Sequence, residues 1–222
     1  TGRWFSLHRD DVDPTTATQA VCEQLLVRHG VVTRGAVAAE GVTGGFARVY
    51  KALSVFEDNG HVRRGYYVDG LGGAQFARPS IVDELRHHAL DDRKTHHTVV
   101  LATTDPANPY GAALDWPATG ADDSGHRPGR KPGALVVIAD GEPALFVERG
   151  GKTVLTFTAD ADLLREASSA LADAVRSGRI NRLTIDQVDG ANVLGTQIAA
   201  AFVEAGFATT PRGVRLRYGL HA

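Results

Sequence analysis

The chain has 222 residues, of which 43% are hydrophobic and 23% are charged, and its formal net charge is −2. These proportions are typical of a globular protein with a buried core in one large or two small domains, and they exclude a disordered chain. A charge so close to zero argues against an overall basic surface for nucleic acid, although a local basic face stays open. No apolar run approaches the ~18 residues of a membrane-spanning helix.

The first part of the chain has the pattern of three helices. Pro14 opens the first helix and Gly30 ends it, and Thr33 opens a short second helix. In the third, at residues 44–58, hydrophobic residues recur at spacings of three and four along one face, and Asn59-Gly60 follows as a stop signal.

A glycine-rich hairpin is expected next. The stretch RRGYYVDGLGGAQFA, residues 63–77, reads as two short strands joined by a turn. Three helices followed by such a hairpin form a winged helix, which is a helix-turn-helix motif with a β-hairpin wing. We therefore predict a winged-helix domain at residues 14–79, with residues 44–58 as its recognition helix.

The second part predicts a mixed module. A helix that starts at Ser80 links the two parts over residues 80–95, and residues 96–222 follow as an α+β module. This module starts with a strand at 98–105 and a long loop at about 106–132, and continues with three strands of an antiparallel meander. A helix, a strand at 182–190, another helix and a closing strand or hairpin complete it. The predicted fold class is α+β, with either a small antiparallel sheet or a β-barrel-like arrangement.

Cations and aromatic residues of both parts are candidates for binding nucleic acid. They are Arg48 and Lys51 on the recognition helix, Arg63, Arg64, Tyr66, Tyr67 and Gln75 on the wing, and Arg212, Arg215 and Arg217 on the last strand. Strand alternation predicts that only one of the two tyrosines faces solvent, and that the three arginines of the last strand share a face. Solvated charges, inward-packed rings or ion pairs with another subunit are the alternatives.

The sequence does not predict a metal site or a disulfide. His87, His88, His96 and His97 are the most clustered histidines, but adjacent residues of a helix point about 100 degrees apart. Asp83 or Asp91 could join His87 as a ligand, and a solvated helix end and linker is the preferred interpretation. Cys22 is the single cysteine and lies in an apolar helical pattern, which indicates a buried core residue in a reducing compartment. We expect a cytoplasmic, nucleoid-associated protein without a membrane partner.

Four stretches together resemble a known family. TGRW at the start, the wing sequence above, LATTDPANPYGAALDWP and PGALVVIADGEPALFVERGG are similar to the extreme C-terminal portion of Lhr, the large helicase-related proteins of bacteria. The resemblance implies an ATP-dependent, 3′-to-5′ single-stranded-DNA motor in an N-terminal part, followed by winged-helix modules and a terminal β-barrel-like module. We expect this chain to be a fragment, with residues 1–13 as the link to a preceding module. The alanine, glycine, valine and arginine bias suits an actinobacterial source.

No nucleotide site is expected in this chain. It lacks the G-x-x-x-x-G-K-[ST] phosphate loop, and Gly150-Gly151-Lys152-Thr153 reads as a hairpin turn, so ATP and Mg²⁺ belong to the parent helicase by resemblance. The extension of the family is also similar to DNA glycosylases that use a Gln-x-Gln or Gln-x-Asp pair. Only Gln187-Val188-Asp189 matches that pattern here, and a turn at Asp189-Gly190 explains it as well.

Three functions therefore stay open. The first is an accessory module of a DNA-repair helicase that binds or positions single-stranded or forked DNA. The second is a scaffolding module that packs against the preceding winged helices or forms homo-oligomers. The third and weakest is part of a glycosylase-like unit.

Overall fold

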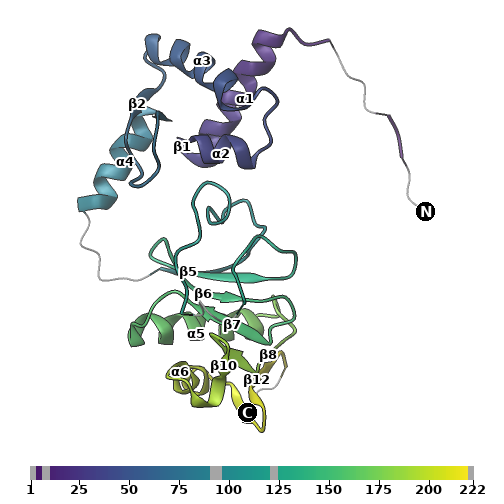
Figure 1. The fold of residues 1–222 in the computed structure, drawn as a ribbon. Helices are drawn as coiled ribbons and strands as arrows, with labels where there is room; N and C mark the ends of the chain where they lie inside the picture. Colours follow the sequence, from purple (N-terminus) through teal and green to yellow (C-terminus); the bar gives the residue numbers. More distant parts are fainter. Residues whose placement is uncertain (1–3, 7–10, 91–96, 121–124, 220–222) are drawn as a thin grey trace. The chain divides into compact units, whose positions relative to one another are not determined.

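The structure is a computed structural model that describes residues 4–6, 11–90, 97–120 and 125–219 (Figure 1). The chain divides into two compact units, Thr1–Asp92 with Ala112–Leu114, and Arg93–Gly111 with Asp115–Ala222. Each unit has a hydrophobic core of its own. Within the described residues, no helix is long and apolar enough to cross a membrane.

The first unit is a winged helix, as predicted. Its elements are α1 (Pro14–His29), β1 (Val31–Val32), α2 (Arg34–Ala39), α3 (Gly45–Asp58), β2 (Arg63–Gly65), β3 (Gln75–Ala77) and α4 (Pro79–Leu90). The three strands form an antiparallel sheet in the order β1-β3-β2. Val49 and Leu53 of α3 are fully buried against Cys22, Leu25 and Phe76, so the apolar periodicity of α3 faces the core.

Local sequence signals set the helix ends of this unit. The Asp13 carboxylate accepts a hydrogen bond from the Thr16 amide at the start of α1, and Thr33 Oγ1 accepts one from the Ala36 amide at the start of α2. Gly30 ends α1 with φ of 66°, in the left-handed region that favours glycine. Helix α4 begins at Pro79, one residue before the predicted Ser80, because proline suits the first turn of a helix.

The second unit contains two sheets and two packed helices. Its elements are β4 (Thr98–Ala102), β5 (Leu135–Ala139), β6 (Glu142–Val147), β7 (Thr153–Thr156), α5 (Ala161–Arg176), β8 (Arg182–Ile185), β9 (Gln187–Val188), β10 (Ala191–Asn192), a 3₁₀ turn (Val193–Gly195), α6 (Ile198–Glu204), β11 (Ala208–Thr210) and β12 (Gly213–Arg217). One sheet has the order β10-β9-β7-β6-β5-β4, and the other has the order β11-β12-β8. The α+β class is confirmed.

Three details of the predicted module are wrong. Both sheets are open in the described residues, so the β-barrel-like alternative does not hold, and β7 pairs with β9 in parallel rather than antiparallel. Helix α5 lies between β7 and β9 in the chain and supplies the long crossover that a parallel pair requires. The single strand predicted at 182–190 is in fact two strands, β8 and β9, in different sheets on either side of Asp186.

The six-stranded sheet is covered on both faces. Leu145 of β6 faces the core formed with α5 and α6, and its neighbour Phe146 faces a second cluster with Trp116 and Phe157. The Trp116 ring stacks on the Phe157 ring with a centroid distance of 5.9 Å, so the long loop after β4 covers this second face. Burial on both faces explains why β5 and β6 read as continuous apolar runs.

Candidate nucleic-acid interface

Gln75 organises the loop of the wing. Its side chain is fully buried, and its Oε1 accepts hydrogen bonds from the Tyr67 and Val68 amides at 2.9 Å each. Its Nε2 donates to the carbonyl oxygens of Val68 at 2.9 Å and Leu71 at 2.6 Å. All four bonds lie within the wing, so the expectation that Gln75 contacts nucleic acid is wrong. Its role is to fix the loop between β2 and β3.

The two tyrosines of the wing have different surroundings. Tyr67 is half-buried, its Oη donates to the Arg63 carbonyl at 3.0 Å, and its ring lies against Gly65, where a Cβ would be 2.9 Å from the ring. Burial raises the pKa of Tyr67. Tyr66 has 84% of its surface exposed. One tyrosine therefore faces solvent, although both lie beyond the end of β2 and the loop, rather than strand alternation, separates them.

The two arginines of the wing also differ. The Arg64 guanidinium donates to Tyr50 Oη at 2.5 Å and lies 3.2 Å from the Glu57 carboxylate, so it fastens the wing to α3. Its backbone amide also donates to Glu57, at 3.2 Å. Arg63 is exposed, and its guanidinium makes no ion pair with any described residue. Arg63 is therefore the arginine that is available to a phosphate.

A similar division applies to the recognition helix. Nε and Nη2 of Arg48 donate to Thr18 Oγ1 at 2.9 and 2.6 Å, and Nη1 donates to the Thr43 carbonyl at 3.3 Å, so Arg48 holds α3 against α1. Lys51 is exposed and has no ion-pair partner in the described part of the chain. Next to it, α1 and α3 border a hollow of about 680 Å³ whose lining includes Thr18, Val55 and Phe56.

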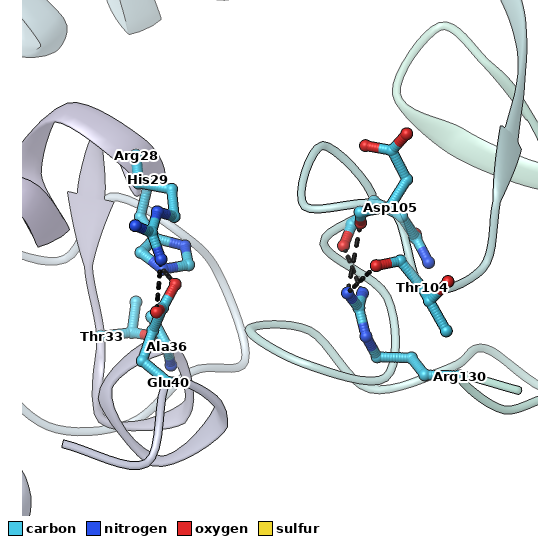
Figure 2. Close-up of polar contacts among 9 residues, drawn as sticks. Arg28, His29, Thr33, Ala36, Glu40, Thr104, Asp105 and Arg130 are labelled. Atoms are coloured by element: carbon cyan, nitrogen blue, oxygen red, sulfur yellow. Dashed lines mark hydrogen bonds and ion pairs between the residues drawn. The ribbon is translucent and has the colours of Figure 1, made fainter. Parts of the chain in front are cut away.

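A charged cluster at the end of α2 fixes this helix against α1. Figure 2 shows the Glu40 carboxylate in contact with both Arg28 and His29. Its oxygens lie 2.5 Å from Arg28 Nη1 and 3.1 Å from His29 Nε2. The hydrogen bond from Arg28 and the weaker one from His29 outweigh partial burial and hold the pKa of Glu40 below its ordinary value.

In the second unit, Arg130 orders the long loop. Its guanidinium donates to the carbonyl oxygens of Thr104 and Asp105 at 3.2 Å each, as Figure 2 also shows, and to that of Asn108 at 2.7 Å. Since this cation is engaged with backbone oxygens, it is part of the fold of the loop.

The arginines near the C-terminus are only partly as predicted. Arg215 and Arg217 are exposed on the same face of β12, whereas Arg212 lies in the turn before that strand. Three positions separate Arg212 from Arg215, and alternation places residues on one face only at even separations, so the expectation of three aligned arginines was wrong. The strand register places Arg182 of β8 directly opposite Arg217, and Tyr218 follows with 59% of its surface exposed. Neither Arg182 nor Tyr218 stands out in the sequence, because only the pairing of β8 with β12 brings Arg182 to Arg217 and Tyr218.

The Gln-x-Asp match lies at a tight turn. Asp189 has φ of 51°, and its carboxylate accepts hydrogen bonds from the Thr156 amide at 2.9 Å and the Thr156 hydroxyl at 2.6 Å. A Cβ at Gly120 would lie 2.9 Å from Asp189 Oδ2, so the loop covers this carboxylate closely. Gln187 is exposed on β9. The arrangement fits a carboxylate that closes the turn after β9.

No candidate metal centre is found in the part of the chain that the structure describes, where no three histidine, cysteine or acidic side chains converge. His87 and His88 lie on α4 with ring centroids 6.2 Å apart, and His96 lies outside the described residues. Cys22 is buried in the first core, and burial raises the pKa of its thiol to about 11.

Comparison with known proteins yields matches along nearly the whole chain. Residues 11–97 match the winged-helix domain of the large helicase-related protein. A Mycolicibacterium smegmatis protein named Lhr helicase/probable uracil glycosylase is 52% identical over 97% of the chain, and an Escherichia coli protein named Lhr helicase/uracil glycosylase is 38% identical over 96%. The chain spans 15% and 14% of the lengths of these two relatives.

Proposed function

The chain belongs to the large helicase-related (Lhr) family, and we propose that it is an accessory module that binds single-stranded or forked DNA through its wing. The observation that carries this proposal is the exposed Tyr66 ring on the same hairpin as the unpaired Arg63, in a loop that Gln75 holds in shape. An aromatic face accepts any base and a nearby cation accepts a phosphate.

The internal hydrogen bonds of the wing favour this role energetically. A stacked base contributes roughly 1–3 kcal/mol, and an ordered loop loses less conformational entropy on binding than a mobile one. The four hydrogen bonds of Gln75 order the loop before any ligand arrives. Lys51 on α3 supplies a second unpaired cation, and both cations make the proposed affinity sensitive to salt.

The activity of the whole protein is a further proposal that rests on the family. The two relatives carry helicase in their names, and this chain corresponds to about a seventh of their length. We propose that the parent protein is an ATP- and Mg²⁺-dependent 3′-to-5′ helicase of DNA repair in the cytoplasm, associated with the nucleoid. In that setting the wing would hold the strand while a motor elsewhere in the parent protein moves along it.

Fluorescence anisotropy tests the role of the wing. The chain is titrated against labelled single-stranded, duplex and forked DNA at two salt concentrations. We expect Tyr66→Ala to weaken binding about 5- to 160-fold, which corresponds to roughly 1–3 kcal/mol, and Tyr66→Phe to preserve it because the ring remains. Arg63→Ala should weaken binding and lower the slope of log affinity against log salt by roughly 0.7, whereas the ion-paired Arg165→Ala serves as the charge-matched control. Absence of DNA binding at low salt refutes the proposal.

Scaffolding is the second candidate function, and the hollow between α1 and α3 favours it. The exposed Val55 and the half-buried Phe56 give this hollow an apolar lining that another protein surface could fill, either a preceding module or a second copy of the chain. Sedimentation of the chain over a range of concentrations tests the second copy. Concentration-dependent assembly that Val55→Asp abolishes, without DNA affinity, would support scaffolding in place of DNA binding.

The glycosylase alternative has the least support in this chain. Both relatives have uracil glycosylase in their names, but the Asp189 carboxylate already accepts two hydrogen bonds from Thr156 and lies against Gly120. Release of uracil from single-stranded DNA by this chain, abolished by Asp189→Asn with no change in melting temperature, would establish the activity. We expect no such release.

A further inference from the structure

We propose that the solvent face of the sheet β11-β12-β8 is a second binding site for single-stranded nucleic acid. Arg182, Arg215 and Arg217 form that face, and Tyr218, which follows β12, lines a hollow at its edge together with Arg182 and Arg217. This site belongs to the second unit and does not depend on the role proposed for the wing. Its ligand class is a polyanion with flat bases, because the site combines unpaired cations with an exposed ring.

The strand register brings the cations together. Arg217 of β12 lies opposite Arg182 of β8, and Arg215 lies two positions earlier on β12, opposite Thr184. The alternate residues Val214, Leu183 and Ile185 are buried in the core, so the arginines point to the other face. The Tyr218 amide donates to the Asn181 carbonyl at 2.9 Å. Arg217 and Arg182 are therefore a non-hydrogen-bonded pair, the class whose side chains lie closer together.

This arrangement has no evident benefit for folding. Like charges directly opposite each other on a sheet are destabilising, and no described carboxylate forms an ion pair with any of the three guanidinium groups. Two exposed arginines of the same unit do have such partners, since Arg165 pairs with Asp162 and Arg176 with Asp173. A bound anion would relieve the repulsion between Arg182 and Arg217.

The aromatic residue decides which polyanion fits best. Asn181, Arg182, Arg217 and Tyr218 line a shallow hollow of about 440 Å³. The Tyr218 ring rests on Gly178, where a Cβ would lie 3.1 Å from the ring and φ of 77° also favours glycine, so the ring is supported on one side. A base can stack on this ring while neighbouring phosphates reach the arginines. Arg215 and Arg217 are two residues apart along β12, which corresponds to about 6.8 Å. An acidic peptide would use the cations but not the ring.

The affinity of the chain for a labelled single-stranded thymidine oligonucleotide tests the site. We expect Arg182→Gln/Arg217→Gln to weaken binding at least 10-fold and to lower the salt slope by roughly 1.4, two phosphates at about 0.7 each. Tyr218→Ala should weaken it about 5- to 160-fold, and Tyr218→Phe should bind like wild type. The control Arg86→Gln/Arg165→Gln removes the same total charge from ion-paired arginines and should change affinity less than twofold.

Thermal melting separates this role from a structural one. Because the double glutamine variant removes a repulsion, its melting temperature should equal or exceed that of wild type, whereas a structural role for the arginines predicts a decrease. Photo-crosslinking with 4-thiothymidine, mapped by mass spectrometry, should label Tyr218 in wild type and in Tyr66→Ala alike. Labelling confined to the wing would refute this site and leave the wing proposal standing. Labelling confined to Tyr218 would support this site and refute the wing proposal. Tighter competition by polyglutamate than by unlabelled oligonucleotide would overturn the nucleic-acid assignment.

Discussion

Replacing Gln75 with leucine should destabilise the wing even though the side chain reaches no ligand. Leucine fills a similar volume but makes none of the four hydrogen bonds to Tyr67, Val68 and Leu71. At about 0.5–1.5 kcal/mol for each bond, the total is about 2–6 kcal/mol. The loop lies at the surface, so water can replace part of what is lost, and we expect a decrease in the free energy of unfolding of about 2–4 kcal/mol.

Urea denaturation measures that decrease, and hydrogen exchange locates it. The amides of Tyr67 and Val68 donate to Gln75 in wild type, so they should exchange faster in Gln75→Leu while amides in the middle of α3 change little. Gln19→Leu, the same substitution at an exposed position of α1, should change stability by less than about 0.5 kcal/mol. Wild-type exchange at residues 67 and 68, together with unchanged stability, would show that Gln75 does not hold the loop.

Three further substitutions test other parts of the structure. Arg28 lowers the pKa of Glu40, so its contribution is present at neutral pH and is lost as pH falls through that lowered value; melting temperatures of wild type and Glu40→Gln should differ at pH 7 and converge in acid, and parallel curves would contradict this. Gly213→Ala would place a Cβ 2.0 Å from the Ile185 carbonyl oxygen, so the free energy of unfolding in urea should fall by about 3 kcal/mol. An unchanged free energy of unfolding would show that β12 moves away from β8 to make room. Arg48→Met keeps the apolar stem but loses the bonds to Thr18, so stability should fall by about 1–3 kcal/mol with an unchanged salt slope of DNA binding; a lower slope would mean that Arg48 contacts phosphate.

Local sequence signals predicted the winged helix well. The periodic apolar residues of α3, the cap at Thr33 and the stop at Gly30 act over a few residues, and the structure has the same helices within about one residue. The family resemblance rested on stretches from both units, and matches over 97% and 96% of the chain agree with it.

Pairing between distant strands was not visible in the sequence. Nothing in RLTIDQV shows that Asp186 separates two strands in two sheets, because the partners are distant in the chain. Strand β9 pairs with β7, which precedes α5, and β8 pairs with β12, near the end of the chain. For the same reason Arg182 was overlooked. Its neighbour Arg217 is 35 positions away, and only the register of β8 against β12 makes the pair.

The candidate binding residues divide by a property that the sequence does not contain, namely whether each charge already has a partner. Arg48 and Arg64 looked as suitable as Lys51 and Arg63 because all four lie on the recognition helix or the wing. In the structure, Arg48 is bound to Thr18 and Arg64 to Tyr50 and Glu57, whereas Lys51 and Arg63 have no ion-pair partner among the described residues. A guanidinium that fixes one element against another cannot turn to a phosphate without giving up those bonds. The paired arginines should therefore govern stability and the unpaired cations the salt dependence of binding.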